Sequence, residues 1–403
     1  MARRLVVFTK LFWPEGGGAE LATHTIVRDI LSKYFNVAVV SGTKSPAPDV
    51  LKCCRYIYWE ALRSRFKPVE WFRVFANSHD VKKLVKGADI VYITSHSLLP
   101  LAIVAKAIRL GVKVVVHLHN YQPLTFTSII LAGRRPDLAT DVVVELGESG
   151  SIFRAVASGF GHYVNVLSRV ALLYADRVIC VSKRQCEILE RYAPEVRGKA
   201  AVVYNPLPPM PSIEKRPDEE PTILYVGGGS FIKGFHIAVK TLAKVLASHN
   251  ARAYVIAGRS VRPEQARLLE KLSKKCGERF VVLGRVPHEE LLKLHSRAWA
   301  LLFPSISEEP LPYAVLEAMA VGTLPIASRT GGVPEIVGGS LAENYLFSPG
   351  NTKELLDKVE RIVTLSREEL IELSTKLREH VQRKFNIDKA AEKLLAHINK
   401  LLK

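Results

Sequence analysis

The sequence predicts an α/β protein made of two doubly wound domains that face a cleft. Two series of short, wholly apolar runs predict this fold, because strands that are apolar throughout are buried on both faces of a parallel sheet. Segments with helical period separate the runs, which is typical of βαβ units. A stretch rich in proline and charge, residues 206–221, lies between the two series and predicts a linker.

The expected strands follow one another along both halves of the chain. In the first half they are residues 5–8, 37–40, 90–94, 114–117, 178–181 and 201–204, and in the second half 223–226, 253–257, 280–283, 299–303 and 324–327. Segment 121–170 is the least regular part, and residues 366–402 are helical by period. We therefore expect an N-terminal domain over 1–205, the linker over 206–221 and a second domain over 222–385. A final helix over 386–403 can pack back on the first domain.

Composition narrows the classes of function. The chain has 403 residues, of which 48% are hydrophobic and 24% charged, and this excludes a disordered or collagen-like protein. Lys and Arg exceed Asp and Glu by 57 to 39, which gives a formal net charge of +18. Such an excess predicts anionic partners, namely phosphorylated ligands, nucleic acid or an acidic membrane surface.

The cysteines and the N-terminus favour a cytoplasmic protein. The five cysteines form no C-x-x-C pair, which argues against a disulfide framework and against a zinc site. The first apolar run is too short for the core of a signal peptide, and no run of about 18 apolar residues could span a membrane. Many charges and only three methionines favour a thermophilic source.

Two glycine-rich loops lie at expected strand–helix junctions, one in each domain. The first contains Gly17 and Gly18, and the second begins at residue 227 and leads to Lys233. Backbone N–H groups of such loops can approach an anion at a helix N-terminus, and a lysine ammonium can join them. Each loop could instead be a simple tight turn, and neither has the spacing of a dinucleotide-binding or P-loop motif. Together they favour a phosphorylated ligand in the cleft.

Glu309 and Glu317 lie in the most informative segment, after the expected strand 299–303. If the residues between them are helical, the two carboxylates lie roughly 12 Å apart along the axis. A glycosidase pair needs about 5–9.5 Å, so the spacing suits a grip on two ends of one extended ligand. Glu317 has apolar neighbours, so we expect partial burial and a hydrogen-bond partner.

These motifs resemble those of glycosyltransferase family 4, retaining enzymes with the GT-B fold of two Rossmann-like domains. The resemblance rests on Glu309-x7-Glu317, the Ala-Met-Ala-x-Gly that follows, and Gly331-Gly-Val-Pro-Glu-Ile-Val337. It extends over nearly the whole chain through segments 16–20, 178–182, 202–205 and 282–286. It implies a hexosyltransferase that moves a hexose-like sugar from a nucleotide diphosphate sugar to a hydroxyl acceptor, such as a lipid-linked acceptor or a glycan.

The resemblance also implies roles for individual residues. Glu309 would bind hydroxyls of the donor sugar, and Glu317 would bind the ribose. The diphosphate would contact Lys233 and the N–H groups of Gly17 and Gly18. Further backbone donors to the donor substrate would be Leu311, Tyr313 and Ala314, and the strand that ends at Val286 would face the nucleobase.

Two positions depart from the family pattern. The family has an arginine where this chain has Gly228, so Arg259 is a candidate substitute for the missing phosphate contact. Pro312 stands where the family has a glycine, and neither Pro310 nor Pro312 can donate a backbone hydrogen bond.

His117 and His119 follow the expected strand 114–117, and strand alternation sends them to the same side. A lone histidine there is more often structural, and the resemblance favours His119 beside the donor sugar or the acceptor. No D-x-D motif occurs, and no third ligand is spaced to complete a metal site. We therefore expect neither a metal nor another cofactor.

Basic and aromatic residues are interleaved over residues 55–86. This mixture suits an anionic membrane surface, and it would also suit single-stranded nucleic acid. The aromatic rings could instead belong to the core beneath a solvated basic surface. Because many members of the family act on lipid-linked acceptors, we expect peripheral membrane contact. Nucleic acid is the less favoured partner.

Two other classes of function stay open at this point. The first is a nucleotide-sugar epimerase or a phosphorylase of the same architecture. The second is a non-enzymatic module that binds a sugar nucleotide or nucleic acid through its basic surface.

Overall fold

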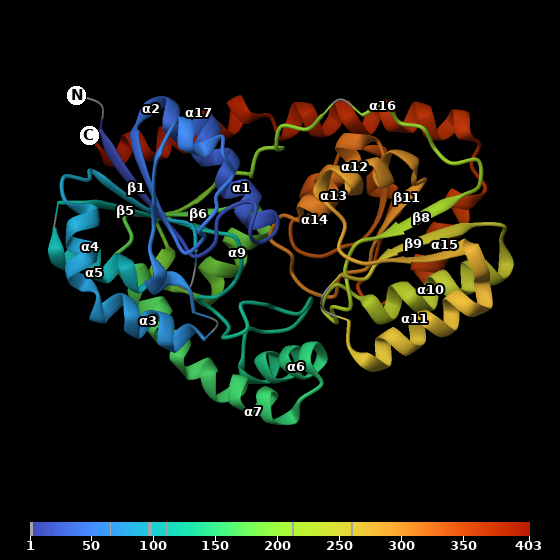
Figure 1. The fold of residues 1–403 in the computed structure, drawn as a ribbon, viewed down its shortest axis with the longest axis horizontal. Coiled ribbons are helices and arrows are strands. Elements are labelled where there is room, and N and C mark those ends of the chain that lie inside the picture. Colours follow the sequence, from blue (N-terminus) through green and yellow to red (C-terminus); the bar gives the residue numbers. More distant parts are fainter. Residues whose placement is uncertain (1–2, 65, 96–98, 110, 212, 259–260) are drawn as a thin grey trace.

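The computed structural model describes residues 3–64, 66–95, 99–109, 111–211, 213–258 and 261–403, which form two α/β lobes side by side (Figure 1). Each lobe contains a parallel sheet with helices on its faces, so the predicted fold class is confirmed. The linker runs between the lobes without helix or strand over its described residues.

The first sheet has the strand order β3-β2-β1-β4-β5-β6-β7 within the described residues. Its strands are β1 (Arg4–Thr9), β2 (Asn36–Ser41), β3 (Arg55–Tyr58), β4 (Ile90–Ile93), β5 (Lys113–Leu118), β6 (Arg177–Cys180) and β7 (Ala200–Val202). Strand β1 lies between β2 and β4, and its Leu5 pairs with Val37 of β2 and with Ile90 of β4. The strand order therefore reverses beside β1, which is where open α/β sheets bind ligands.

The second sheet has the order β10-β9-β8-β11-β12-β13 within the described residues. Its strands are β8 (Thr222–Tyr225), β9 (Arg252–Ile256), β10 (Phe280–Leu283), β11 (Ala300–Phe303), β12 (Leu324–Ser328) and β13 (Leu346–Phe347). Every apolar run predicted as a strand is one here, whereas β3 and β13 were not predicted.

Helices cover both sheets. In the first lobe they are α1 (Gly18–Ile26), α2 (Ser32–Tyr34), α3 (Lys67–Ala76), α4 (Ser78–Val85), α5 (Pro100–Ile108), α6 (Leu138–Ser149), α7 (Ile152–Gly161), α8 (Asn165–Leu173) and α9 (Lys183–Tyr192). In the second they are α10 (Phe235–Ser248), α11 (Pro263–Cys276), α12 (His288–Arg297), α13 (Tyr313–Val321), α14 (Val333–Val337) and α15 (Thr352–Val363). The irregular segment 121–170 is thus a long loop followed by α6, α7 and the start of α8.

The C-terminal helices connect the two lobes. Helix α16 (Arg367–Lys384) lies along the second lobe, and α17 (Ile387–Leu401) crosses to the first, near the N-terminus (Figure 1). Leu394 and Ile398 of α17 are buried in the same core cluster as Leu5 and Val7 of β1. The end of the chain therefore completes the core of the first domain.

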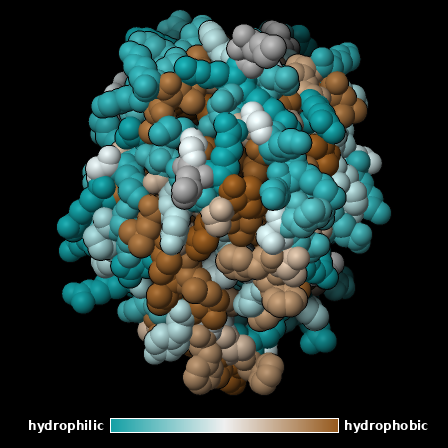
Figure 2. Space-filling model, turned by 90° about the vertical axis from the view of Figure 1, so that its left-hand side faces the viewer, coloured by the Kyte–Doolittle hydropathy of each residue, from teal (hydrophilic) through white to brown (hydrophobic). Residues whose placement is uncertain are grey.

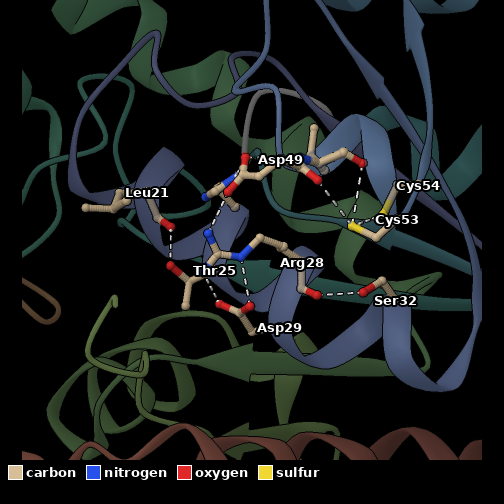
Figure 3. A network of polar contacts seen from close by, with 10 residues as sticks. Leu21, Thr25, Arg28, Asp29, Ser32, Asp49, Cys53 and Cys54 are labelled. Atoms are coloured by element: carbon tan, nitrogen blue, oxygen red, sulfur yellow. Dashed lines mark hydrogen bonds and ion pairs between the residues drawn. The ribbon is translucent and has the colours of Figure 1, made fainter. Parts of the chain in front are cut away.

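A polar network fixes the helix that follows the first glycine loop (Figure 3). Arg28, in the π-helical turn Val27–Leu31 after α1, donates to Asp29 at 2.5 Å and to Asp49 at 2.6 Å. The ring of His24 lies 2.9 Å from the other Asp49 oxygen. Burial alone would raise the pKa of Asp49, but the hydrogen bonds from Arg28 and His24 lower it overall.

The aromatic and basic segment 55–86 divides between core and surface. Trp71 is buried, and Trp59 is half-buried against the core, so these rings do not face solvent. Helix α3 does expose apolar rings, among them Phe72, which is 72% exposed. The segment as a whole is therefore not one aromatic surface.

Candidate active site

A cleft of about 480 Å³ lies between the two domains. The residues around it follow the carboxyl ends of strands in both sheets, as expected for open α/β sheets. The predicted residues in its lining are Gly17, Gly18, His119, Lys233, Glu309, Leu311, Tyr313, Ala314 and Glu317. The fold therefore brings both glycine loops and both glutamates to one place.

Lys233 and Glu309, both of the second domain, form an ion pair in this cleft, with Nζ and Oε1 2.5 Å apart. Lys233 is placed by the turn between β8 and α10, where Gly234 has a φ of +72°. A Cβ at Gly234 would overlap the carbonyl oxygen of Pro304, so the turn requires glycine there. The lysine ammonium also lies over the ring of Phe303, 5.8 Å from its centre.

A glycine pair in a second loop holds Glu309 in position. The N–H of Gly332 donates to the carbonyl oxygen of Glu309 at 2.8 Å, and a Cβ at Gly331 would overlap that oxygen. The neighbouring Glu308 accepts the N–H of Gly331 at 2.8 Å. This close approach explains why the sequence has two glycines before Val333.

Glu317 is 6% exposed and has the hydrogen-bond partner expected for it. The partner is His288, whose Nε2 lies 2.8 Å from Glu317 Oε1. The hydrogen bond to Glu317 raises the pKa of His288, despite partial burial. The ring of Trp13 packs edge-on against His288, with centroids 5.8 Å apart. The sequence did not predict either His288 or Trp13 as a site residue, because the only feature that marks them is a position after an expected strand.

The first glycine loop differs from its expected role at one position. The N–H of Gly17 donates to Glu20 Oε2 at 2.8 Å, so an internal carboxylate already engages this predicted phosphate donor. Burial raises the pKa of Glu20. Gly18 begins α1 and faces the second domain, where a Cβ on it would lie 3.2 Å from the Cβ of Tyr313.

The start of α13 also differs from the expectation. The helix begins at Tyr313 instead of near Leu311, so the residues from Glu309 to Pro312 are not helical and the 12 Å estimate does not apply. Tyr313 donates its hydroxyl to the carbonyl oxygen of Pro206 at 2.7 Å, which ties the helix to the linker. The N–H groups of Tyr313 and Ala314 lie in the first turn, where helix N–H groups have no partner within the helix.

His119 lines the cleft and stacks on His117, with ring centroids 4.6 Å apart. Burial lowers the pKa of His119 to about 4, so its imidazole is neutral at pH 7. His117 is enclosed and lies 2.7 Å from the hydroxyl of Tyr92. The pair thus divides into a structural histidine and one that faces the cleft beside Asn205.

Three predicted residues lie elsewhere. Gly228 has a φ of +60°, and its N–H donates to the carbonyl oxygen of Ile256 at 3.2 Å. Val286 packs against the core of the second domain. Neither is in the lining of the cleft. Arg259 lies outside the described residues.

Contacts between the domains involve carboxylates that sequence reasoning missed. Glu335 of α14 accepts the N–H groups of Lys183 and Arg184 at 2.9 and 2.8 Å, at the start of α9. Glu148 of α6 accepts the hydroxyl of Ser230 at 2.8 Å and the N–H of Ile232 at 2.9 Å. These bonds join residues far apart in the chain, so no local pattern could have revealed them.

The described residues contain neither a membrane-spanning helix nor a cluster of metal ligands. None of their helices combines the length and the apolar character needed to cross a bilayer. They also contain no group of three or more His, Cys, Asp or Glu side chains arranged to hold a metal ion.

Known proteins are similar to this chain in sequence and in fold. Models for "Glycosyltransferase Family 4" and "Glycosyl transferases group 1" match residues 16–209 and 209–384. An uncharacterized glycosyltransferase of Methanocaldococcus jannaschii is 28% identical over 247 residues, which are 57% of this chain and 61% of that relative. The chain thus spans about three fifths of that relative's length.

Solved structures resemble the whole fold. Sucrose-phosphate synthase from Thermosynechococcus elongatus has a TM-score of 0.73 and 18% identity, with 99% of each chain covered. Anabaena HepE, solved in complex with UDP-glucose, has a TM-score of 0.64 and 16% identity, with 98% of this chain and 99% of that chain covered. The matches in sequence and the two facing parallel sheets point to the same family. The chain belongs to glycosyltransferase family 4, with the GT-B fold.

Proposed function

We propose that the protein is a retaining glycosyltransferase that moves a hexose-like sugar from a nucleotide diphosphate sugar to a hydroxyl acceptor. The observation that carries this proposal is the placement of Lys233 and Glu309 in the same cleft as Glu317. A cation for the diphosphate and two separate carboxylates for two sets of hydroxyls suit a ligand with a sugar at one end and a ribose at the other. HepE, a structural relative, is solved with UDP-glucose, which supports this ligand class.

In the proposed reaction the bond between the sugar C1 and the diphosphate oxygen breaks, and the acceptor oxygen bonds to C1 on the same face. Lys233 and the N–H groups at the start of α13 stabilise the charge on the leaving diphosphate. A diphosphate oxygen takes the proton of the acceptor hydroxyl. Glu309 stabilises the positive charge on the sugar ring, and neutral His119 contacts the sugar or the acceptor.

We propose that this transfer needs no metal ion. Lys233 and helix N–H groups supply positive charge where the diphosphate leaves, which is the role a divalent cation would otherwise have. We expect turnover to be unchanged by EDTA.

The experiment that tests the proposal is a thermal-shift panel of UDP, GDP, ADP, dTDP and their sugars. A ligand at 100 times its Kd should add about 2.7 kcal/mol to the free energy of unfolding. The best donor is then incubated with and without acceptors, and the product anomer is assigned by NMR. No shift across the panel, or an inverted anomer, would overturn the proposal. An epimerised donor without release of diphosphate would show the epimerase alternative.

We also propose that the protein is cytoplasmic and binds an anionic membrane surface through helices α3, α7 and α8. Outward residues on these helices form what we call the apolar face: Val69, Phe72, Phe75, Ile152, Phe153, Val156, Phe160, Val166, Leu167, Val170 and Leu173. Phe153 is 85% exposed and Ile152 is 74% exposed. Figure 2 shows hydrophobic residues gathered on this side of the molecule.

The three helices are neighbours. Helices α3 and α8 both contact α5, and Lys67 at the start of α3 lies over the ring of Phe126, 5.1 Å from its centre. A Cβ added to Gly161 at the end of α7 would meet the same ring. An exposed apolar area of this extent on a globular protein marks an interaction surface.

The charge around the apolar face favours an anionic bilayer, and not a second copy of the chain, as its partner. Residues 150–175 contain no Asp or Glu, and the whole chain carries +18. The two arginines of this segment, Arg154 and Arg169, pair with Glu145 and Glu195 outside it. Exposed Arg73, Lys82 and Lys83 add positive charge on α3 and α4. Two such faces would repel each other, whereas each basic residue near an anionic bilayer contributes about 1 kcal/mol of attraction.

A further inference from the structure

A second hollow, of about 360 Å³, opens beside the candidate active site. Arginines line it from two segments: Arg134 and Arg135 from the loop after β5, and Arg184 and Arg191 from α9, which follows β6. Both segments leave the carboxyl ends of neighbouring strands, at the edge of the first sheet that faces the second domain.

Regular structure fixes both groups of arginines. On α9 the lining positions 184, 187, 188 and 191 have the spacing of a single helix face. The loop is held by an antiparallel bridge between Leu131 and Ser307 and by the N–H of Ala132, which donates to the carbonyl oxygen of Ile306 at 2.9 Å. The second domain thus fixes the loop that carries Arg134 and Arg135.

The carboxylates in this hollow are already engaged. Glu308 is 6% exposed and accepts two hydrogen bonds from Arg184, the shorter 2.8 Å long. Glu187 lies 3.8 Å from the same guanidinium. Within the described part of the chain, Arg134, Arg135 and Arg191 have no ion pair. All three are exposed and line the same hollow, so their positive charges are available to a bound dianion.

The hollow and the candidate active site share a wall. Glu308 lines the hollow, and the next residue, Glu309, lines the cleft where the donor sugar is proposed to bind. The hollow therefore lies directly on the other side of the chain segment that carries Glu309. The arginines also belong to the first domain, opposite the lysine proposed to bind the donor diphosphate.

We propose that this hollow binds a phosphate group of the acceptor and so selects phosphorylated acceptors. The inference rests on the proposed function and specifies its acceptor. Guanidinium groups match the geometry of phosphate oxygens and donate paired hydrogen bonds to them. The phosphate can belong to a water-soluble sugar phosphate or to a lipid, because both present the same anionic group.

The test measures binding to protein saturated with the nucleoside diphosphate that the thermal-shift panel selects, so that the donor site is filled. The probes are glucose 6-phosphate, glucose, and a short-chain phosphatidic acid below its micellar concentration, each titrated by calorimetry. We expect a phosphorylated probe to bind and glucose not to bind. The double variant Arg134→Gln/Arg191→Gln should bind that probe at least tenfold more weakly. Its affinity for the nucleoside diphosphate should be unchanged, which also shows that it is folded.

The matched control is Lys271→Gln/Lys275→Gln, which removes the same charge from the exposed face of α11 and should bind like the wild type. Binding of glucose 6-phosphate alone indicates a soluble acceptor, and binding of the phosphatidic acid alone indicates a lipid. Binding of neither, equal binding of glucose, or equal binding by the arginine variant would overturn the inference. If no nucleoside diphosphate binds the wild type, the proposed function itself fails, which is a separate outcome.

Discussion

Glu309 and Lys233 lie 2.5 Å apart, so each limits what the other can bind. A diphosphate that reaches Lys233 must compete with the carboxylate of Glu309. A donor sugar supplies hydroxyls that can satisfy this carboxylate as the lysine changes partner. The pair therefore links recognition of the sugar to recognition of the diphosphate.

The two glutamates should respond differently to the same substitution. Glu309→Gln loses a charge-assisted hydrogen bond, worth roughly 1.5–3 kcal/mol. The loss is larger in the transition state, when the ring becomes positive, so kcat should fall at least about tenfold. Binding of the free nucleoside diphosphate should not weaken, because this ligand lacks the sugar. Glu317→Gln should weaken that ligand itself through the ribose.

Calorimetry with the nucleoside diphosphate and turnover with the intact donor distinguish these two effects. The control is Glu379→Gln, an exposed position on α16, and it should change neither measurement. Equal weakening of the free nucleoside diphosphate by the substitutions at Glu309 and Glu317 would contradict the assignment.

His288 makes the stability of the site depend on pH. Its pKa is raised above the ordinary 6.5 by the hydrogen bond to Glu317, so the folded protein holds this proton more tightly than the unfolded chain does. Its stabilising contribution is therefore complete below about pH 6.5 and is lost as pH rises through the raised folded pKa. The difference in Tm between wild type and His288→Gln should be largest near pH 5.5 and should shrink by pH 9. A difference that grows with pH would show that the pair is not charged.

At the scale of elements, the turn between β8 and α10 decides where Lys233 points. Gly234→Ala places a residue with a Cβ at a φ of +72°, and this strain lowers the free energy of unfolding by about 1–2 kcal/mol. The new Cβ also overlaps the carbonyl oxygen of Pro304. We expect lower stability in urea and at least about tenfold weaker binding of the nucleoside diphosphate, because the lysine moves with the turn.

Gly198→Ala is a matched control for this variant. Gly198 has a φ of +73°, but a Cβ there would meet no atom within 4 Å. It should lose a similar amount of stability to backbone strain and keep its affinity for the nucleoside diphosphate. Equal affinities for the two variants would show that the turn does not control Lys233.

At the scale of the whole molecule, charge and apolar exposure coincide on the first domain. We expect the protein to co-sediment with vesicles that contain phosphatidylserine and to be released as salt rises, because salt screens the attraction. Phe153→Gln/Phe160→Gln should weaken this binding at least about tenfold, since a buried Phe side chain contributes about 1.5–3 kcal/mol. Both rings are exposed, so the variant should stay folded.

The control for the vesicle experiment is Leu268→Gln/Ile371→Gln, which removes two exposed apolar side chains from the second domain. It should bind vesicles like the wild type. Equal binding to neutral vesicles, or no binding, would contradict the membrane proposal. A change of oligomeric state in the Phe variant alone would instead show that the apolar face joins two copies of the chain.

The sequence by itself determined the fold class, and nine of the residues that it predicted for the site line the cleft. Runs such as residues 5–8 and 223–226 are short, apolar throughout and separated by segments with helical period, which indicates strands covered on both faces. The edge strand β3 lacked this signal because its side chains are exposed or half-buried, and β13 is only two residues long. Since the carboxyl ends of parallel strands meet at one edge of a sheet, Lys233, Glu309 and Glu317 could be placed together before any coordinates.

Only the tertiary structure decided which side chains pair. His288 and Glu317 are separated by 29 positions, Glu148 and Ser230 by 82, and Arg184 and Glu308 by 124. Periodicity and turn signals act over a few residues, so they carry no information about such pairs. The solvent-facing apolar face, and the arginines that have no ion pair among the described residues, also depend on how whole helices pack. Packing buries one carboxylate and leaves another free, and the linear sequence does not fix that outcome.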